Sequence, residues 1–141
     1  RPLTCIAFGP NAFVSQEADN EEAAAAAAEA ISQPVAKALR QVTRISDTIG
    51  RLGPGEFVVV APGTDPDGAV RLADRVLEAL QAGAGLGIGI GPDTIAQLRA
   101  GFCAVEGTEP TTPEDLLLRA TMALRKAQAD DGSFRVRAYE A

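Results

Sequence analysis

Apolar and polar positions follow one another along the chain in patterns that separate short strands from longer helices. The run Leu3–Phe8 is almost entirely apolar and is closed by a Gly-Pro pair, which predicts a buried strand. From about residue 19 to residue 39, an alanine-rich stretch carries apolar residues at helical spacing and predicts a helix. Pro34 lies inside this stretch, so we expect either a kink or two helices that meet near Ser32-Gln33.

The middle of the chain has the pattern of a β-hairpin followed by a helix. Asp47–Leu52 and Glu56–Ala61 are strand-like runs, and Gly53–Gly55 between them predicts a tight turn. The segment Asp67–Leu80 predicts a second long helix, because its apolar residues fall on one helical face: Val70, Ala73, Val76, Leu77 and Leu80.

The last third of the chain predicts strand, helix and strand. Leu98–Val105 is a further apolar run, and a helix is expected from Thr112, whose hydroxyl precedes a proline and two acids, to about Ala129. Phe134–Tyr139 alternates apolar and polar residues, which predicts a strand whose solvated face carries Arg135 and Arg137.

This order of elements predicts the fold class α/β (α+β), with a single mixed, largely antiparallel sheet of about five strands covered by helices.

Glycine at every second position of Gly83–Gly91 fits either a flexible loop or a weak strand, and its spacing fails the dinucleotide-binding pattern. A length of 141 residues corresponds to one domain, residues 1–141. Because the chain begins at Arg1, we expect it to be a piece of a longer protein.

Charge and composition exclude several classes of function. The net charge of −6 disfavours nucleic-acid polymers and anionic lipid surfaces as partners. The chain has no histidine, which excludes catalytic triads, histidine zinc sites and histidine general bases. Cys5 and Cys103 each lie in an apolar run and are predicted to be reduced core residues rather than a disulfide or metal site.

No apolar stretch approaches the roughly 20 residues of a membrane span, and no signal peptide opens the chain. We therefore expect a bacterial cytoplasmic domain that makes no membrane contact itself, either independent or as the cytoplasmic part of a larger or membrane-anchored protein. The abundance of alanine and glycine suggests a GC-rich bacterial genome.

One hairpin carries a resemblance to a known family. Arg44-Ile-Ser-Asp47, five further residues and Gly53-Pro54-Gly55-Glu56-Phe57 resemble the signature turn of the GGDEF family, the bacterial diguanylate cyclases, with its preceding Arg-x-x-Asp. The resemblance implies a nucleotide-cyclase or palm-like fold and a signalling protein. Active members resemble two-metal phosphoryl-transfer enzymes, in which carboxylates hold Mg²⁺.

The positions that would carry this chemistry are altered. The aspartate that ends the first strand in the family aligns with Gly9, the signature acid aligns with Gly55, and Pro54 replaces the second signature glycine. The family's phosphate-binding lysine aligns with Gln128, next to Lys126. We therefore expect a degenerate domain with no catalytic residue, no metal ligand and no Mg²⁺ cofactor, in which Glu56 is a solvated hairpin residue.

Arg44 and Asp47 survive, and in the family Arg-x-x-Asp is the inhibitory site that binds cyclic di-GMP. An arginine can donate two hydrogen bonds to guanine O6 and N7 or hold a phosphate, and Asp47 can accept from the guanine N1–H and amino groups. The alternative is a structural pair, in which Asp47 caps the preceding segment or pairs with Arg44 or Arg51 at the surface.

The sequence thus favours a catalytically inactive GGDEF-like domain that is a cyclic di-GMP receptor. The alternative is a pseudo-enzyme that acts as a homodimerisation or protein-interaction module in a longer signalling chain, without a nucleotide ligand. GTP binding without turnover would lack base-reading residues, and an active cyclase would need a metal site made elsewhere.

Overall fold

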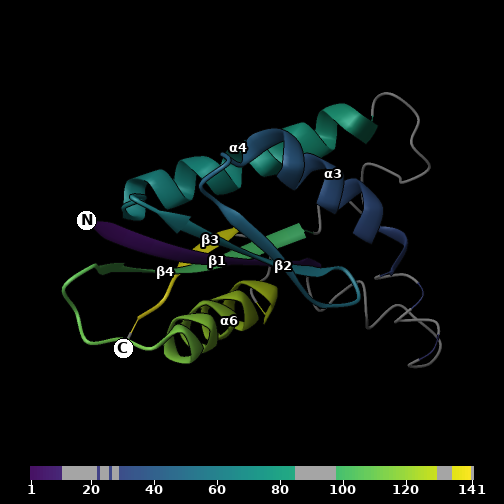
Figure 1. Ribbon diagram of the computed structural model, residues 1–141. Coiled ribbons are helices and arrows are strands. Elements are labelled where there is room, and N and C mark those ends of the chain that lie inside the picture. The colour runs from purple at the N-terminus through teal and green to yellow at the C-terminus, as the bar shows by residue number, and fades with distance from the viewer. Residues whose placement is uncertain (11–21, 23–25, 27–28, 85–97, 130–134, 141) are drawn as a thin grey trace.

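A five-stranded sheet forms the centre of the molecule, with helices on both faces (Figure 1). The computed structural model describes residues 1–10, 22, 26, 29–84, 98–129 and 135–140. In chain order the elements are β1 Pro2–Pro10, α3 Ser32–Val42, β2 Thr48–Gly53, β3 Glu56–Pro62, α4 Pro66–Ala84, β4 Leu98–Glu106, α6 Pro113–Ala129 and β5 Val136–Ala138.

The strands lie in the order β2-β3-β1-β4-β5, with β1 at the centre. β1 pairs antiparallel with both β3 and β4, β2 pairs antiparallel with β3, and β5 alone runs parallel to its neighbour β4. The prediction of a mixed, largely antiparallel five-stranded sheet covered by helices is therefore confirmed.

Each face of the sheet has its own apolar core. On one side α3 and α4 pack together and cover side chains of β1, β3 and β4 that include Phe8, Val59 and Phe102. On the other side α6 packs mainly on β4 and β1, around Cys5, Ala7, Cys103, Val105, Leu116, Ala120 and Leu124. Both cysteines are buried and free, as predicted.

The predicted interruption of the first helical region is confirmed. Residues 29 and 30 are helical, Ile31 forms a turn, and α3 then begins at Ser32. Pro34 lies in the first turn of α3, where its missing N–H costs no intrahelical hydrogen bond. Most of the alanine-rich stretch lies outside the described residues.

The hairpin and the helix after it form as predicted, with one error. The turn between β2 and β3 has Pro54 followed by Gly55 at φ 70°, a positive angle that glycine adopts readily. α4 buries four of the five apolar residues expected on one face, but Val70 is exposed. The stripe that α4 buries instead runs through Ala69 and Leu72.

α6 lies very close to β4. The hydroxyl of Thr112 accepts from the Asp115 backbone N–H at 3.1 Å, so the predicted cap and the proline after it start the helix. A Cβ added to Gly101 of β4 would lie 2.0 Å from the backbone nitrogen of Leu124. The helix can approach this closely because position 101 has no side chain.

The C-terminal strand differs from its prediction. β5 spans only Val136–Ala138, and Arg135 and Arg137 are half-buried rather than solvated. The segment from residue 85 to residue 91, for which a loop or a weak strand was expected, lies outside the described residues. Within the described part of the chain, no helix has both the length and the apolar character needed to cross a membrane.

Candidate functional site

The segment between α3 and β2 is fixed by local hydrogen bonds. Thr43 caps the end of α3, and its backbone N–H and hydroxyl donate to the Leu39 carbonyl at 2.9 and 2.7 Å. The Arg44 N–H then donates to Asp47 Oδ2 at 2.8 Å, and the Asp47 N–H donates back to the Arg44 carbonyl at 3.0 Å. These reciprocal bonds close a turn that presents both predicted site residues.

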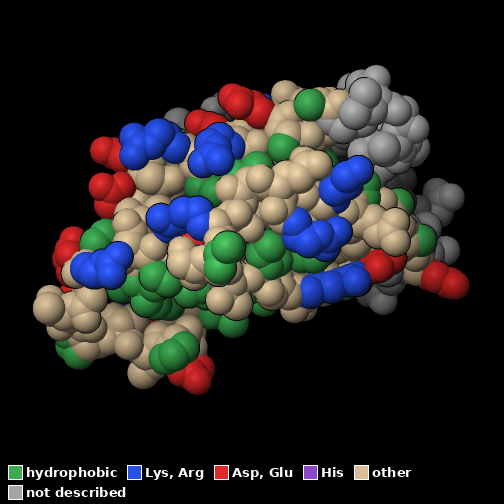
Figure 2. All heavy atoms as spheres, turned by 45° about the horizontal axis from the view of Figure 1, so that its top comes forward, with side chains coloured by type: hydrophobic (Ala, Val, Ile, Leu, Met, Phe, Trp, Pro, Cys, Tyr) green, Lys and Arg blue, Asp and Glu red, His purple; other side chains and the backbone are tan. Residues whose placement is uncertain are grey.

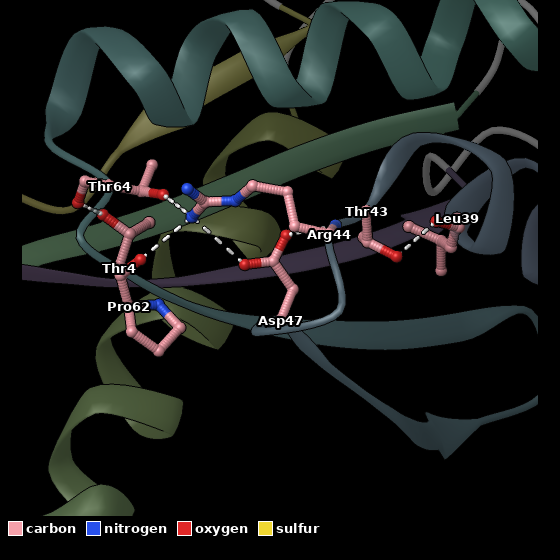
Figure 3. A network of polar contacts seen from close by, with 7 residues as sticks. All are labelled: Thr4, Leu39, Thr43, Arg44, Asp47, Pro62 and Thr64. Carbon is pink, nitrogen blue, oxygen red and sulfur yellow. Dashed lines mark hydrogen bonds and ion pairs between the residues drawn. The ribbon is translucent and has the colours of Figure 1, made fainter.

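Arg44 Nη2 joins this turn to the end of β3 (Figure 3). It donates to Asp47 Oδ1 at 3.3 Å, to the Pro62 carbonyl at 2.9 Å and to Thr64 Oγ1 at 3.0 Å. The Thr64 carbonyl accepts in turn from the buried hydroxyl of Thr4 at 2.6 Å. The guanidinium is therefore held from the side that faces the protein.

The two side chains of this pair differ in exposure. The Arg44 side chain is 57% exposed, whereas the Asp47 side chain is 1% exposed. Among the described residues, Nε and Nη1 of Arg44 have no hydrogen-bond partner. Asp47 thus orients Arg44, and the N–H groups of Nε and Nη1 are available to acceptors from solution.

Arg44 lines a pocket of about 320 Å³ between the α3–β2 turn and α4. Arg71 and Arg75, one turn apart on α4, also line it. The two acids in the lining are already used, since Asp47 accepts from Arg44 and Asp65 Oδ1 accepts from the Gly68 N–H at 2.8 Å. The remaining lining is formed by Val42, Gly63, Thr64, Gly68 and Leu72.

Three arginines and two internally bound acids make this pocket locally basic on a protein whose net charge is −6. Figure 2 shows basic side chains gathered across this face of the molecule, with acidic side chains mostly toward its margin. The pocket suits an anion, or a planar group with paired acceptors such as the Hoogsteen edge of guanine.

The hairpin turn is a second candidate site, and it is tied to α3. The Gly55 N–H donates to Ser32 Oγ at 3.0 Å in a buried position. Arg51 of β2 forms an ion pair with Glu29 and lies 6.0 Å from the centre of the Phe57 ring. The turn's backbone donor is therefore satisfied within the chain rather than directed at a ligand.

Glu56, the acid that remains in the turn, is bound by α6. Arg125 donates to both of its carboxylate oxygens, at 2.6 and 2.9 Å, and Gln128 Nε2 lies 3.4 Å from one of them. The hydrogen bond from Arg125 holds the pKa of Glu56 below its ordinary value. The Glu56 side chain is only 19% exposed, so the expectation of a solvated residue is wrong.

Gly9, at the end of β1, lies beside the same cluster. Gln128 Nε2 donates to the Pro10 carbonyl at 2.7 Å, which brings α6 over the end of the strand. A Cβ at Gly9 would be 3.0 Å from Gln128 Nε2 and 3.1 Å from Glu56 Cγ. The space beside position 9 is thus filled by the side chains of Glu56 and Gln128.

These residues do not fit the Mg²⁺ ions of two-metal phosphoryl transfer. Gly9 and Gly55 bring no side-chain oxygen, and the carboxylate of Glu56 is engaged by a guanidinium. Among the described residues, no three His, Cys, Asp or Glu side chains are grouped so that they could hold a metal ion. Hard divalent cations need several oxygen ligands, which this donor set does not supply.

Three residues of these clusters were missed from the sequence. Arg125 occupies the place beside Glu56, whereas the considered substitute Lys126 is exposed on α6. Arg125 and Gln128 are three residues apart, so their shared helical face was a usable signal. Arg71 and Arg75 are four residues apart, so they also share one helical face that the sequence could have indicated.

The fold and the hairpin define a domain of the nucleotide-cyclase type, and the comparisons with known proteins give its family. The family model described as "Diguanylate cyclase, GGDEF domain" matches residues 20–133. The chain therefore belongs to the GGDEF family. Among curated proteins, none matches the chain.

Solved structures of GGDEF domains superpose on nearly the whole chain. The active GGEEF domain of a diguanylate cyclase from Vibrio cholerae has a TM-score of 0.68 and 19% identity, covering 100% of this chain and 85% of that one. The GGDEF domain of YfiN from Pseudomonas aeruginosa has a TM-score of 0.68 and 26% identity, covering 99% and 83%. That of DgcB from Caulobacter crescentus, in complex with cyclic di-GMP, has a TM-score of 0.63 and 16% identity, covering 99% and 79%.

Proposed function

We propose that this GGDEF domain is catalytically inactive and binds cyclic di-GMP in the pocket formed by Arg44, Arg71 and Arg75. The observation that carries the proposal is the fixed position of Arg44, whose Nη2 is held by the protein while its side chain is 57% exposed and lines the pocket. A preorganised arginine loses little conformational freedom when a ligand binds.

Asp47 has a positioning role in this proposal. Its buried carboxylate accepts from the backbone and the side chain of Arg44, so it fixes the arginine and does not read a base itself. Arg71 and Arg75 add two further cations that can hold phosphate groups of the ligand. The relative DgcB was solved with cyclic di-GMP, which makes this dinucleotide the first ligand to test.

Catalytic inactivity is supported by the second cluster. Glu56, the acid that remains, is bound by Arg125 and Gln128, and the space beside Gly9 is filled by these side chains. Two-metal phosphoryl transfer needs a set of carboxylates around the triphosphate, whereas the described residues of this cluster offer only Glu56, which is already paired with Arg125. No magnesium cofactor is expected on this account.

A turnover assay and a melting experiment test the two halves of the proposal separately. Incubation with GTP and Mg²⁺ or Mn²⁺ should yield no cyclic di-GMP, and any sustained synthesis contradicts the proposed inactivity. Cyclic di-GMP at about 100 times its Kd should raise the melting temperature by several degrees, since binding then contributes about 2.7 kcal/mol. GTP is expected to cause no such rise.

The alternative, an interaction module without a nucleotide ligand, has a distinct outcome. It predicts an unchanged melting temperature with either nucleotide, together with an oligomeric state that depends on protein concentration or on a partner protein. The observation that favours this alternative is the exposure of three apolar side chains on α6, which a partner protein could cover: Leu117, Leu118 and Met122.

A further inference from the structure

The outer face of α6 is divided into an acidic end, an apolar middle and a basic end. Leu118 and Met122 are 57% and 48% exposed in the middle of the helix. Glu114 lies one turn before Leu118, and Lys126 lies one turn after Met122, both exposed. These four residues follow one another at a spacing of four, so they form one continuous ridge.

The ridge points away from the sheet. α6 packs on β1, β4 and β5 through Leu116, Ala120, Ala123, Leu124 and Ala127, which are buried. In Figure 1 α6 lies on the opposite side of the sheet from α3 and α4. The ridge is therefore also remote from the Arg44 pocket, which lies beside α4.

We propose that this ridge is an interface between two copies of the chain, in which the two α6 helices pack antiparallel around a two-fold axis near Ala120. The spacing makes the surface self-complementary in that orientation only. Leu118 faces Met122 of the partner subunit, and Glu114 faces Lys126 of the partner subunit, each pair formed twice. A parallel arrangement would instead place like charges together at both ends.

The charges of the ridge favour a second copy of the chain over an anionic membrane as its partner. An anionic membrane would attract the basic end of the ridge and repel the acidic end, so the two effects oppose each other and give no net attraction. A second copy in antiparallel orientation satisfies both ends at once. Because the apolar middle consists of one leucine and one methionine per copy, we expect a small interface and a weak, reversible dimer.

A competing explanation is that the charges only complement the helix dipole. Acids near the N-terminus and bases near the C-terminus of a helix stabilise it without any partner. The two explanations make opposite predictions when both charges are exchanged. The double variant E114K/K126E opposes the dipole at both ends, but it restores opposite charges across the proposed interface.

Sedimentation velocity of the whole chain, without nucleotide, tests the proposal from about 10 μM to about 1 mM. The wild type should dimerise, and Glu114→Lys or Lys126→Glu should each weaken the dimer about tenfold or more, because two like-charged pairs replace two ion pairs. The double variant should recover the wild-type association. An equimolar mixture of the two single variants should also associate, since the heterodimer again pairs opposite charges.

The apolar middle is tested with Leu118→Glu, which should abolish dimerisation. The matched control is Val70→Glu, which places the same charge on an exposed apolar position of α4 and should leave association unchanged. Circular dichroism checks that each variant is folded. A wild type that stays monomeric throughout overturns the proposal, as does a double variant weaker than both singles or a Val70→Glu effect equal to that of Leu118→Glu.

Discussion

Glu56 is the acid that remains in the signature turn, and its carboxylate is bound by side chains of α6. Arg125 reaches it from α6, 69 residues away in the chain, and its bidentate contact is the strongest arrangement available between these two side chains. The contact also raises the pKa of Arg125, so both partners remain charged. A carboxylate in this state contributes to the stability of the fold.

This interaction predicts a pH dependence of stability. The pKa of Glu56 is lower in the folded than in the unfolded chain, so its contribution is present above the unfolded value near 4.5 and is lost as pH falls through the folded value. Glu56→Gln should therefore melt about 3–5 °C below the wild type at pH 7. The difference should shrink below about pH 4.5, and a constant difference down to pH 3 would contradict the account.

The burial of Cys5 and Cys103 predicts that their thiols react slowly with reagents in solution. Burial raises the pKa of Cys5 to about 11, with a further contribution from the neighbouring Cys103, and burial also raises the pKa of Cys103. Because the thiolate is the reactive form, both residues should react slowly with an aromatic disulfide reagent at pH 7.5. Unfolding in guanidinium should release both thiols at once, whereas rapid labelling of the native protein would show that the cores open more easily than proposed.

At the scale of single residues, the sequence indicated candidate residues but not the side chains that they contact. Arg44, Asp47 and the turn residues could be singled out as candidates because they are close together in the chain. Arg125 was missed because its partner Glu56 is distant in sequence, and only the packing of α6 over the end of β1 brings them together. The burial of the Asp47 carboxylate likewise follows from the position of β3 beside the turn, which no local pattern contains.

At the scale of elements, the strands and helices followed their periodicities closely, except where the tertiary context decided exposure. β1, β3, β4 and α6 match the predicted ranges within two residues at each end. Val70 was placed on the buried face by its spacing, but α4 turns a neighbouring stripe toward the sheet. β5 spans Val136–Ala138, and backbone hydrogen bonds of Arg135 and Tyr139 with β4 flank it on both sides.

The contact of α6 with β4 gives the sharpest test of packing. Gly101→Ala should destabilise the protein by about 3 kcal/mol or more, which lowers the melting temperature by about 10 °C, since the new methyl group overlaps the backbone of Leu124. Gly53→Ala is the matched control, because a Cβ there meets nothing within 4 Å. Equal melting temperatures for the two variants would contradict the described packing of α6.

At the scale of the whole molecule, a net charge of −6 coexists with a basic pocket beside α4. The overall charge disfavours nucleic-acid polymers as partners, yet it does not describe a pocket that three arginines line. Membership of the GGDEF family sets the fold. The individual substitutions at positions 9 and 55 and the internal pairing of Glu56 underlie the proposed loss of catalysis.

Calorimetric titration of cyclic di-GMP into the wild-type chain and three variants tests the central claim most directly. The wild type should bind with a micromolar Kd, about −8 kcal/mol, and Arg44→Ala and Arg75→Ala should each weaken binding about tenfold or more. Arg40→Ala is the matched control, because this exposed cation of α3 lies outside the pocket. A wild type that does not bind, or an Arg44→Ala variant that binds as tightly as the wild type, would contradict the receptor proposal.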